Sequence, residues 1–242
     1  MPFTFAHPAI ILPFEKVKWL SITGLIAGAV VPDFEYFIRM HISSIYSHTI
    51  LGLFWFDVPL GVLIAFLFHN LVRDSFYKNL PPVLRARVSP YMFISWNIYF
   101  KKHWQIVLLS VFIGVCSHLL LDDFTHPTGY FVKLAPAFFT KVVVASIPLY
   151  KILQHSFTLL STLYIIYYVQ KMPKAPIKDK PSLKYWTWII ILSITVLILR
   201  FWMMPDYRHI ANVVVSVISA FMLGLIFVPM ILYKNQNRDS SA

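Results

Sequence analysis

A short stretch near the middle of the chain carries the residue types most suited to bind a metal ion. Residues 117–129 read SHLLLDDFTHPTG and follow a long apolar run. His118, Asp122 and His126 are spaced by four, so a helix would place all three side chains on one face. Imidazole and carboxylate at that spacing suit a borderline-soft cation such as zinc. The stretch therefore predicts a metal site; the alternative is a helix end whose acids are solvated among headgroups.

The same stretch predicts where its helix ends. Pro127 disfavours helical geometry at His126, and Gly129 is available for the turn that follows. Asp122 and Asp123 stand together at the end of a lipid-length segment, where ionisable groups are costly and usually functional. We therefore expect the helix to stop at the third candidate ligand, with the acids beside it.

The composition is that of an integral membrane protein. Of 242 residues, 58% are hydrophobic, 17% are aromatic and only 13% are charged, whereas a soluble domain carries about 25% charged residues. The mean hydropathy is +0.69. The formal net charge of +11 comes mostly from basic residues between apolar runs, as in cytoplasmic loops that contact anionic lipid. We expect membrane lipids as partners and no nucleic acid.

A single cysteine, Cys116, excludes an intramolecular disulfide and a zinc site built on several thiolates. Any metal must then be held by histidine, aspartate and glutamate. Residues 1–19 lack the basic start and the small-residue cleavage site of a signal peptide, and we do not expect one there.

Apolar runs of membrane-spanning length predict an all-α, polytopic helical bundle of about five spans, with further short helices buried or at the interface. A shorter run from Leu20 to Val31 cannot cross about 30 Å of hydrocarbon, and its small residues suit close helix packing inside the bundle. Residues 171–185 form a basic linker, and residues 186–242 form a C-terminal transmembrane hairpin with a polar tail. The expected spans cover residues 50–72, 104–121, 156–170, 186–204 and 210–233.

The basic segments predict which ends of the spans share a membrane face. Residues 73–103 and 171–184 carry the strongest excess of lysine and arginine, so both should face the cytoplasm. The span that ends at Asp122 then delivers it to the opposite, extracytoplasmic face, where residues 1–49 also belong. Nine candidates gather there: His7, Asp33, Glu35, His48, His118, Asp122, Asp123, His126 and His155. Five lysines on that side oppose this assignment: Lys16, Lys18, Lys133, Lys141 and Lys151.

Asp33 and Glu35 follow the apolar run that Pro32 ends, and each has two interpretations. Asp33 lies among aromatic residues, where a carboxylate needs a cation, a hydrogen-bond donor or a proton, so it is a metal ligand or a helix N-cap. Glu35 is a general base or an orienting group, or else a first-turn acid that the helix dipole favours. Asp123 shares the first two roles.

Three further histidines are candidate ligands. His7 lies in a proline-flanked N-terminal element and is either a ligand or a solvated histidine. His48 and His155 each precede an apolar span, where a lone histidine is either a ligand or an interfacial anchor. One or two zinc ions, or another divalent metal, would accommodate a cluster of this composition.

Five sequence blocks carry a family resemblance: MPFTFAHPA, PDFEYF, SHTILGLFWFD, HLLLDDFTH and LYKILQH. They resemble uncharacterised bacterial integral-membrane proteins with an MPFT-x-x-HP start, a family similar to LexA-regulated inner-membrane metal-dependent hydrolases. The resemblance covers residues 1–170 and implies a membrane-embedded, metal-dependent hydrolase domain there. It also implies a multi-pass protein of the bacterial cytoplasmic (inner) membrane.

More distantly, the histidine and aspartate pattern is similar to the zinc-dependent phospholipase C and P1 nuclease superfamily. Those proteins are all-helical and hydrolyse phosphoesters at a clustered zinc site. Their signature has a histidine, an aspartate four residues on, and a histidine shortly after a proline. His118 and Asp122 match it, while His126 precedes Pro127 instead of following it. His7 and Asp33 would correspond to the superfamily's N-terminal ligands.

These observations lead to a hydrolase hypothesis and to alternatives of other classes. The first is metal-dependent hydrolysis of a phosphoester, on a lipid or lipid-linked substrate whose tail stays in the bilayer. The second is a non-catalytic membrane scaffold or transport component, whose histidines and aspartates pack the helical bundle. A metal-binding but inactive descendant of the hydrolases is the third.

Overall fold

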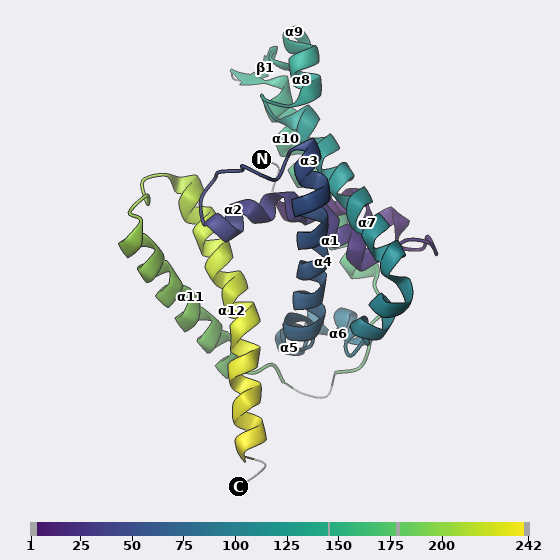
Figure 1. Cartoon of the computed structure of the whole chain (residues 1–242), viewed down its shortest axis with the longest axis vertical. Coiled ribbons are helices and arrows are strands. Elements are labelled where there is room, and N and C mark those ends of the chain that lie inside the picture. The colour runs from purple at the N-terminus through teal and green to yellow at the C-terminus, as the bar shows by residue number, and fades with distance from the viewer. Residues whose placement is uncertain (1–3, 145, 178–179, 240–242) are drawn as a thin grey trace. The chain divides into compact units, whose positions relative to one another are not determined.

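The fold is almost entirely helical, as the composition predicted (Figure 1). The computed structural model describes residues 4–144, 146–177 and 180–239, with the backbone alone for residues 233–239. The α-helices are α1 (Ile22–Val30), α2 (Phe34–Arg39), α3 (Ile50–Gly52), α4 (Val58–Leu67), α5 (Arg73–Asn79), α6 (Pro82–Val88), α7 (Trp96–Thr125), α8 (Tyr130–Leu134), α9 (Pro136–Phe139), α10 (Leu149–Lys171), α11 (Leu183–Met203) and α12 (Ile210–Asp239).

Shorter elements connect these helices. One antiparallel hairpin joins β1 (Val142–Val144) to β2 (Ile147–Pro148). Two π-helical segments, η4 (Leu53–Asp57) and η5 (Phe68–Val72), continue α3 into α4 and α4 into α5. The 3₁₀ segments are η1 (Thr4–Ile10), η2 (Leu12–Phe14), η3 (Val31–Asp33) and η6 (Ser89–Tyr91).

Five helices in the described chain are long and apolar enough to cross a membrane, so the prediction of about five spans is confirmed. This makes the chain a multi-pass membrane protein. The segments extend beyond the expected runs because polar residues at their ends remain helical. They cover Ile50–Asn79, Trp96–Leu134, Leu149–Lys171, Leu183–Met203 and Ile210–Leu232.

The chain divides into two compact units whose segments interleave along the sequence. The first unit contains Met1–Asp33, Ile45–Ala65 and Tyr99–Lys171. The second contains Phe34–Ser44, Phe66–Ile98 and Met172–Ala242. The assignment of residues 1–170 to a hydrolase domain is a statement about function and stays a prediction.

In the first unit, α1 is the short buried helix that its small residues predicted. A Cβ added at Gly114 of α7 would lie 2.4 Å from the Leu25 carbonyl oxygen, and one added at Gly28 would lie 2.1 Å from the Val111 carbonyl oxygen. The two backbones are therefore in direct contact, which only glycine permits. Ser21 caps α1 by accepting a bond from Gly24 N, and its own N–H donates to Ser110 Oγ of α7 at 2.7 Å.

In the second unit, α11 and α12 form an antiparallel hairpin that holds the end of α2. Ser219 Oγ donates to the Phe37 carbonyl oxygen at 2.8 Å, and Ser216 Oγ donates to the Met40 carbonyl oxygen at 3.1 Å. Arg200 Nη2 donates both to that Met40 oxygen and to Asp206 Oδ2. These bonds attach the C-terminal end of α2 to the hairpin, in addition to the backbone bond that the Phe37 carbonyl oxygen accepts from Met40 N at 3.3 Å.

Candidate metal centre

Helix α7 supplies two residues of the site, one turn apart on the same face. His118 is fully buried, and its Nδ1 lies 2.8 Å from the Ala29 carbonyl oxygen. A carbonyl oxygen only accepts hydrogen bonds, so Nδ1 carries a proton and Nε2 is the nitrogen directed at the carboxylates. The direct contact of α1 with α7 brings the Ala29 carbonyl to this position. His118 Nε2 lies 3.5 Å from Asp122 Oδ2.

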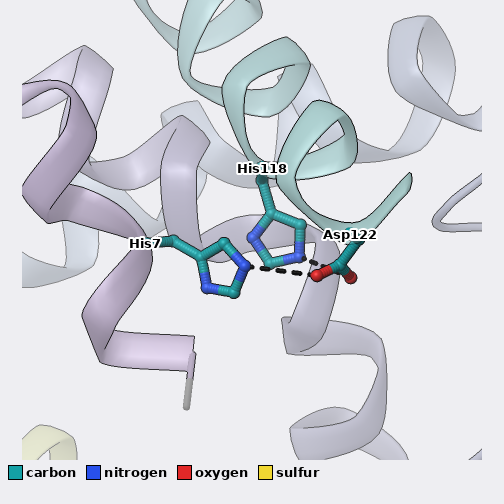
Figure 2. A group of neighbouring side chains, drawn as sticks. All are labelled: His7, His118 and Asp122. Atoms are coloured by element: carbon teal, nitrogen blue, oxygen red, sulfur yellow. Dashed lines mark hydrogen bonds and ion pairs between the residues drawn. The ribbon is translucent and has the colours of Figure 1, made fainter. Parts of the chain in front are cut away.

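The N-terminal segment η1 supplies a second histidine. His7 is fully buried, and its Nδ1 donates to the Thr4 carbonyl oxygen at 3.2 Å, which again leaves Nε2 as the acceptor atom. Its Nε2 lies 3.3 Å from Asp122 Oδ1, and its ring stacks on that of His118 with centroids 3.8 Å apart. Figure 2 shows both imidazoles reaching the Asp122 carboxylate from different elements.

Asp33 lies at the end of η3 and is fully buried. Its Oδ2 accepts a hydrogen bond from Thr4 Oγ1 at 2.5 Å. Its Oδ1 has no hydrogen bond from any described residue, yet lies 3.7 Å from both His118 Nε2 and His48 Nε2. One oxygen is therefore held by the protein, and the other is directed at two histidine nitrogens.

His48 completes the cluster from a strained backbone position. Its φ angle is 60°, in the left-handed region that residues other than glycine seldom adopt outside functional or strained sites. Its Nδ1 lies 3.0 Å from Ser47 Oγ, and its Nε2 lies 3.5 Å from Asp122 Oδ2. The strained backbone thus directs a third imidazole at both carboxylates.

The distances between these atoms fit shared ligation of an ion better than direct hydrogen bonds. Four cross-distances among His48 Nε2, His118 Nε2, Asp33 Oδ1 and Asp122 Oδ2 are 3.5–3.7 Å. Hydrogen bonds between nitrogen and oxygen measure about 2.7–3.2 Å. Ligands about 2.0–2.1 Å from a tetrahedral zinc ion lie about 3.3–3.4 Å from one another. The potential ligand atoms of His7, His118 and Asp122, and those of Asp33, His48 and His118, each lie within 4.8 Å of one another.

The charges of the cluster are balanced by protons on the imidazoles or by a bound metal ion. Asp33 and Asp122 both approach His48 Nε2 and His118 Nε2, and His7 Nε2 also approaches Asp122. Buried carboxylates that face one another and unprotonated nitrogens are stabilised only by a proton or a metal ion. The donor set of imidazole nitrogens and carboxylate oxygens is one that divalent transition metals bind. The residues present therefore fit a metal ion.

The cluster is closed on one side and open on the other. The side chains of Asp33 and His118 are fully buried, and that of His7 is 1% exposed. By contrast, the side chains of His48, His126 and Asp122 are 23%, 20% and 12% exposed. A ligand from outside would approach the cluster past these three residues.

His126 lies at the open edge of the cluster. It is the first residue beyond α7, as Pro127 predicted, and its Nδ1 lies 3.1 Å from the Asp122 carbonyl oxygen and 3.4 Å from Asp122 Oδ1. Its Nε2 is buried and has no hydrogen bond within the described chain. His126 therefore contacts the cluster without belonging to either group of convergent ligand atoms.

Three expected site residues are not brought into the cluster. His155 is exposed on α10, and the neighbouring Gln154 takes the buried position. Asp123 Oδ1 accepts a hydrogen bond from Tyr130 N at 3.0 Å and so joins α7 to α8. Glu35 belongs to the second unit, where its carboxylate bonds to Arg39 Nε at 2.8 Å and Ser44 Oγ at 3.3 Å.

Thr4 is the site residue that sequence reasoning missed. Its hydroxyl holds Asp33 Oδ2 and its carbonyl holds His7 Nδ1, so it orients two of the convergent side chains at once. Such outer partners fix the tautomer and the direction of metal ligands. The threonine three residues before the histidine in the MPFT-x-x-HP start was the only available signal.

An open cleft of about 490 Å³ lies in the second unit and has a different character. Its lining includes His69, Arg73, Asp74 and Trp96. Arg73 donates to Asp74 through Nε and Nη2 and also reaches His69 Nδ1 and the Ile94 carbonyl oxygen. The buried guanidinium of Arg73 in the cleft is thus neutralised by the adjacent Asp74 carboxylate.

Comparison with known proteins gives a family and no function. No curated protein and no solved structure matches the chain. One family model, described as "Domain of unknown function (DUF4184)", matches residues 1–231. Since that match covers almost the whole sequence, the chain belongs to the DUF4184 family.

Proposed function

We propose that this protein is a membrane-bound, zinc-dependent hydrolase of a phosphoester carried by a lipid or lipid-linked substrate. The observation that carries the proposal is the convergence of Asp33 Oδ1 and His118 Nε2 on the same point without a hydrogen bond from the described chain. The resemblance to LexA-regulated metal-dependent hydrolases and to the phospholipase C and P1 nuclease superfamily belongs to the same proposal.

The residues of the cluster have separate roles in this proposal. Asp33, His48, His118 and Asp122 would hold the ion, and His7 would bind through Nε2 beside Asp122 Oδ1. A zinc ion bound there would lower the pKa of a water molecule to about 7 and polarise a phosphoryl oxygen. His126 lies at the open edge with its side chain partly exposed, where a substrate would pass it on the way to the cluster. Thr4 and the Ala29 carbonyl keep the ligands in their productive orientation.

The accessibility of the cluster supports an external substrate. The side chains of Asp33, His118 and His7 are buried, which favours stable binding of an ion. The side chains of His48 and His126 are partly exposed. A site on the end of a membrane span suits a substrate whose apolar tail stays in lipid. We place the site at the extracytoplasmic face of the bacterial inner membrane because residues 73–103 and 171–184 are the most basic segments.

The test combines metal analysis with hydrolysis assays on detergent-purified protein. We expect close to stoichiometric zinc, and hydrolysis of at least one member of a panel containing an aryl phosphomonoester, an aryl phosphodiester and phosphatidylglycerol in mixed micelles. Chelation should abolish activity, and zinc should restore it. Asp122→Asn should lower activity at least about 100-fold, whereas His155→Ala, which changes an exposed histidine, should leave it unchanged.

Two results would contradict the proposal in different ways. Less than about half an equivalent of any transition metal after zinc supplementation would remove the metal site, since a real site of this donor set binds tightly at neutral pH. Stoichiometric zinc without hydrolysis of any panel member would instead support a non-catalytic metal protein.

A further inference from the structure

Residues 130–144 and 146–148 form an apolar lobe at the junction of two candidate membrane spans. The lobe contains α8, α9, β1 and β2, and it connects the end of α7 to the start of α10. Figure 1 shows α8, α9 and β1 together where α7 ends and α10 begins. The first candidate span runs to Leu134 and the second begins at Leu149, so we expect the lobe to lie where the two spans leave the bilayer.

The lobe exposes large apolar side chains on more than one face. Six of them are between 52% and 67% exposed: Tyr130, Leu134, Phe138, Val142, Val143 and Val144. Consecutive residues of a strand point to opposite faces, so both faces of β1 are apolar and exposed. A two-stranded hairpin is marginal in water, and exposed patches of this kind mark membrane or protein contacts. Something other than water should cover this lobe.

The charge of the lobe identifies a lipid surface as the cover. Lys133, Lys141 and Lys151 are exposed in and beside it, and the sequence between Asp123 and Asp179 contains no acidic residue. Apolar and aromatic side chains flanked by lysines are typical of segments in the headgroup region of anionic membranes. Lysines near an anionic surface are attracted to it electrostatically.

Several contacts join the lobe to the helix end that carries the cluster. Asp123 Oδ1 accepts from Tyr130 N at 3.0 Å, and the Phe124 ring stacks on Phe131 with centroids 4.2 Å apart. A Cβ at Gly129 would lie 2.4 Å from the Asp123 carbonyl oxygen, so the turn packs directly on α7. The lobe is therefore attached to the helix end that carries Asp122, and we expect the depth of the lobe to set the depth of the cluster.

We propose that the apolar lobe inserts into the headgroup and acyl boundary of the bilayer and holds the metal cluster at headgroup depth. The inference rests on the proposed function in naming the substrate: a phosphoester group on a membrane lipid or lipid-linked molecule that reaches the open edge laterally. Soluble phosphoesters would reach the same edge only from water and without the help of the lobe.

The depth of the lobe is measured with a nitroxide spin label on a single cysteine. The label is attached to Val143→Cys in a Cys116→Ser background, in nanodiscs of phosphatidylcholine and phosphatidylglycerol. Electron paramagnetic resonance then compares collisions with oxygen, which partitions into lipid, and with a nickel chelate, which stays in water. We expect oxygen contact and exclusion of the chelate at Val143. Lys174→Cys, in the exposed basic linker, should show the reverse.

Two results would overturn the inference. Chelate contact at Val143 equal to that at Lys174 would place the lobe in water. Exclusion of both oxygen and chelate would mean that protein covers the lobe, as in a second copy of this chain. Neither reading depends on metal binding, so a failed depth test is distinct from a failed metal analysis.

The substrate class is tested with the variant Val143→Asp. Its zinc content should equal that of the parent protein, because Val143 does not touch the cluster. Its activity on phosphatidylglycerol in vesicles should fall at least about tenfold relative to its activity on the aryl phosphodiester, given the unfavourable transfer of a charge into the boundary. An unchanged ratio of the two activities would contradict lateral delivery from the membrane.

Discussion

Asp33 Oδ1 and His118 Nε2 lie 3.7 Å apart, both side chains are fully buried, and neither atom has a hydrogen-bond partner in the described chain. This pair should depend on a cation, so zinc should stabilise the fold. Zinc at 100 times its dissociation constant contributes about 2.7 kcal/mol, which corresponds to a rise in Tm of about 5–10 °C for a chain of this size.

Thermal unfolding in detergent, with chelator and then with zinc, measures that shift. Asp33→Asn should remove most of it. His155→Ala is the matched control because it removes an exposed imidazole outside the cluster, and it should retain the full shift. An equal response to zinc in Asp33→Asn and the parent would show that the metal binds elsewhere.

Gly114→Ala should weaken metal binding from outside the cluster. The added methyl group would force α1 away from α7 and displace the Ala29 carbonyl from His118 Nδ1. Loss of such an outer partner lowers metal affinity about 10- to 100-fold, and overpacking destabilises the fold by about 1–3 kcal/mol. Competition with a fluorescent zinc chelator gives the affinity.

The control for this change is Gly224→Ala in α12, where a Cβ would lie 3.1 Å from Ile189 Cγ2, the end of a side chain. It makes the same chemical change within the α11–α12 hairpin and should leave zinc affinity unaltered. If Gly114→Ala bound zinc as tightly as the parent, the contact between α1 and α7 would not set the orientation of His118.

Thr4 should support zinc binding through its hydroxyl group. Thr4→Val keeps the shape of the side chain but removes the donor to Asp33 Oδ2, so zinc affinity should fall about tenfold or more. Thr4→Ser restores the hydroxyl and should recover most of the affinity. Isothermal titration of the metal-free variants distinguishes them; equal losses in Val and Ser would indicate a packing role instead.

Asp206 predicts a stability that depends on pH. The hydrogen bond from Arg200 lowers the pKa of the Asp206 carboxyl below its usual value. A lowered pKa in the folded state stabilises the fold above the unfolded pKa of about 3.9, and this contribution disappears as the pH falls through the folded value. Asp206→Asn should therefore destabilise by about 0.5–1 kcal/mol at neutral pH and by progressively less below about pH 4.

Thermal unfolding of Asp206→Asn and the parent across pH 3–7 gives this comparison. Ser216→Ala is the control, since it removes a bond to the Met40 carbonyl oxygen without removing a titratable group. Its destabilisation should not change with pH. A loss in Asp206→Asn that is independent of pH would show that the ion pair with Arg200 is not the cause.

The orientation that the basic segments lead us to expect predicts which cysteines react from outside. In the Cys116→Ser background, a membrane-impermeant thiol reagent on intact cells should label Thr128→Cys, next to the cluster, and spare Lys174→Cys. The physical reason is the lysine and arginine excess of residues 73–103 and 171–184. The opposite labelling pattern would place the cluster at the cytoplasmic face, with substrates from the cytoplasmic leaflet.

The sequence predicted the helical class and the spans because hydrocarbon thickness sets a minimum apolar length that is readable from one chain. His118 and Asp122 are spaced i, i+4, which places both side chains on the same face of a helix. In the structure both lie on α7 at the cluster. The end of α7 before Pro127 follows from the same local rules. These features need no knowledge of tertiary contacts.

The remaining site features depend on rotation and on distant partners. One step along a helix turns a side chain by about 100°, which separates exposed His155 from buried Gln154 and Asp123 from Asp122. Thr4 and Asp33 meet across 29 positions of sequence, a contact that no local pattern predicts. The left-handed backbone of His48 is also invisible in the sequence, because it arises from surrounding contacts that outweigh its strain.

The contact between His7 and Asp122 joins residues 115 positions apart. During synthesis at about 5–20 residues per second, roughly 6–23 s pass between the appearance of the two residues. The segment η1 therefore cannot dock against His118 and Asp122 until α7 has been made and inserted. The cluster is therefore completed late in biogenesis. A bound ion would then hold the N-terminal segment η1 against α7, which is made later.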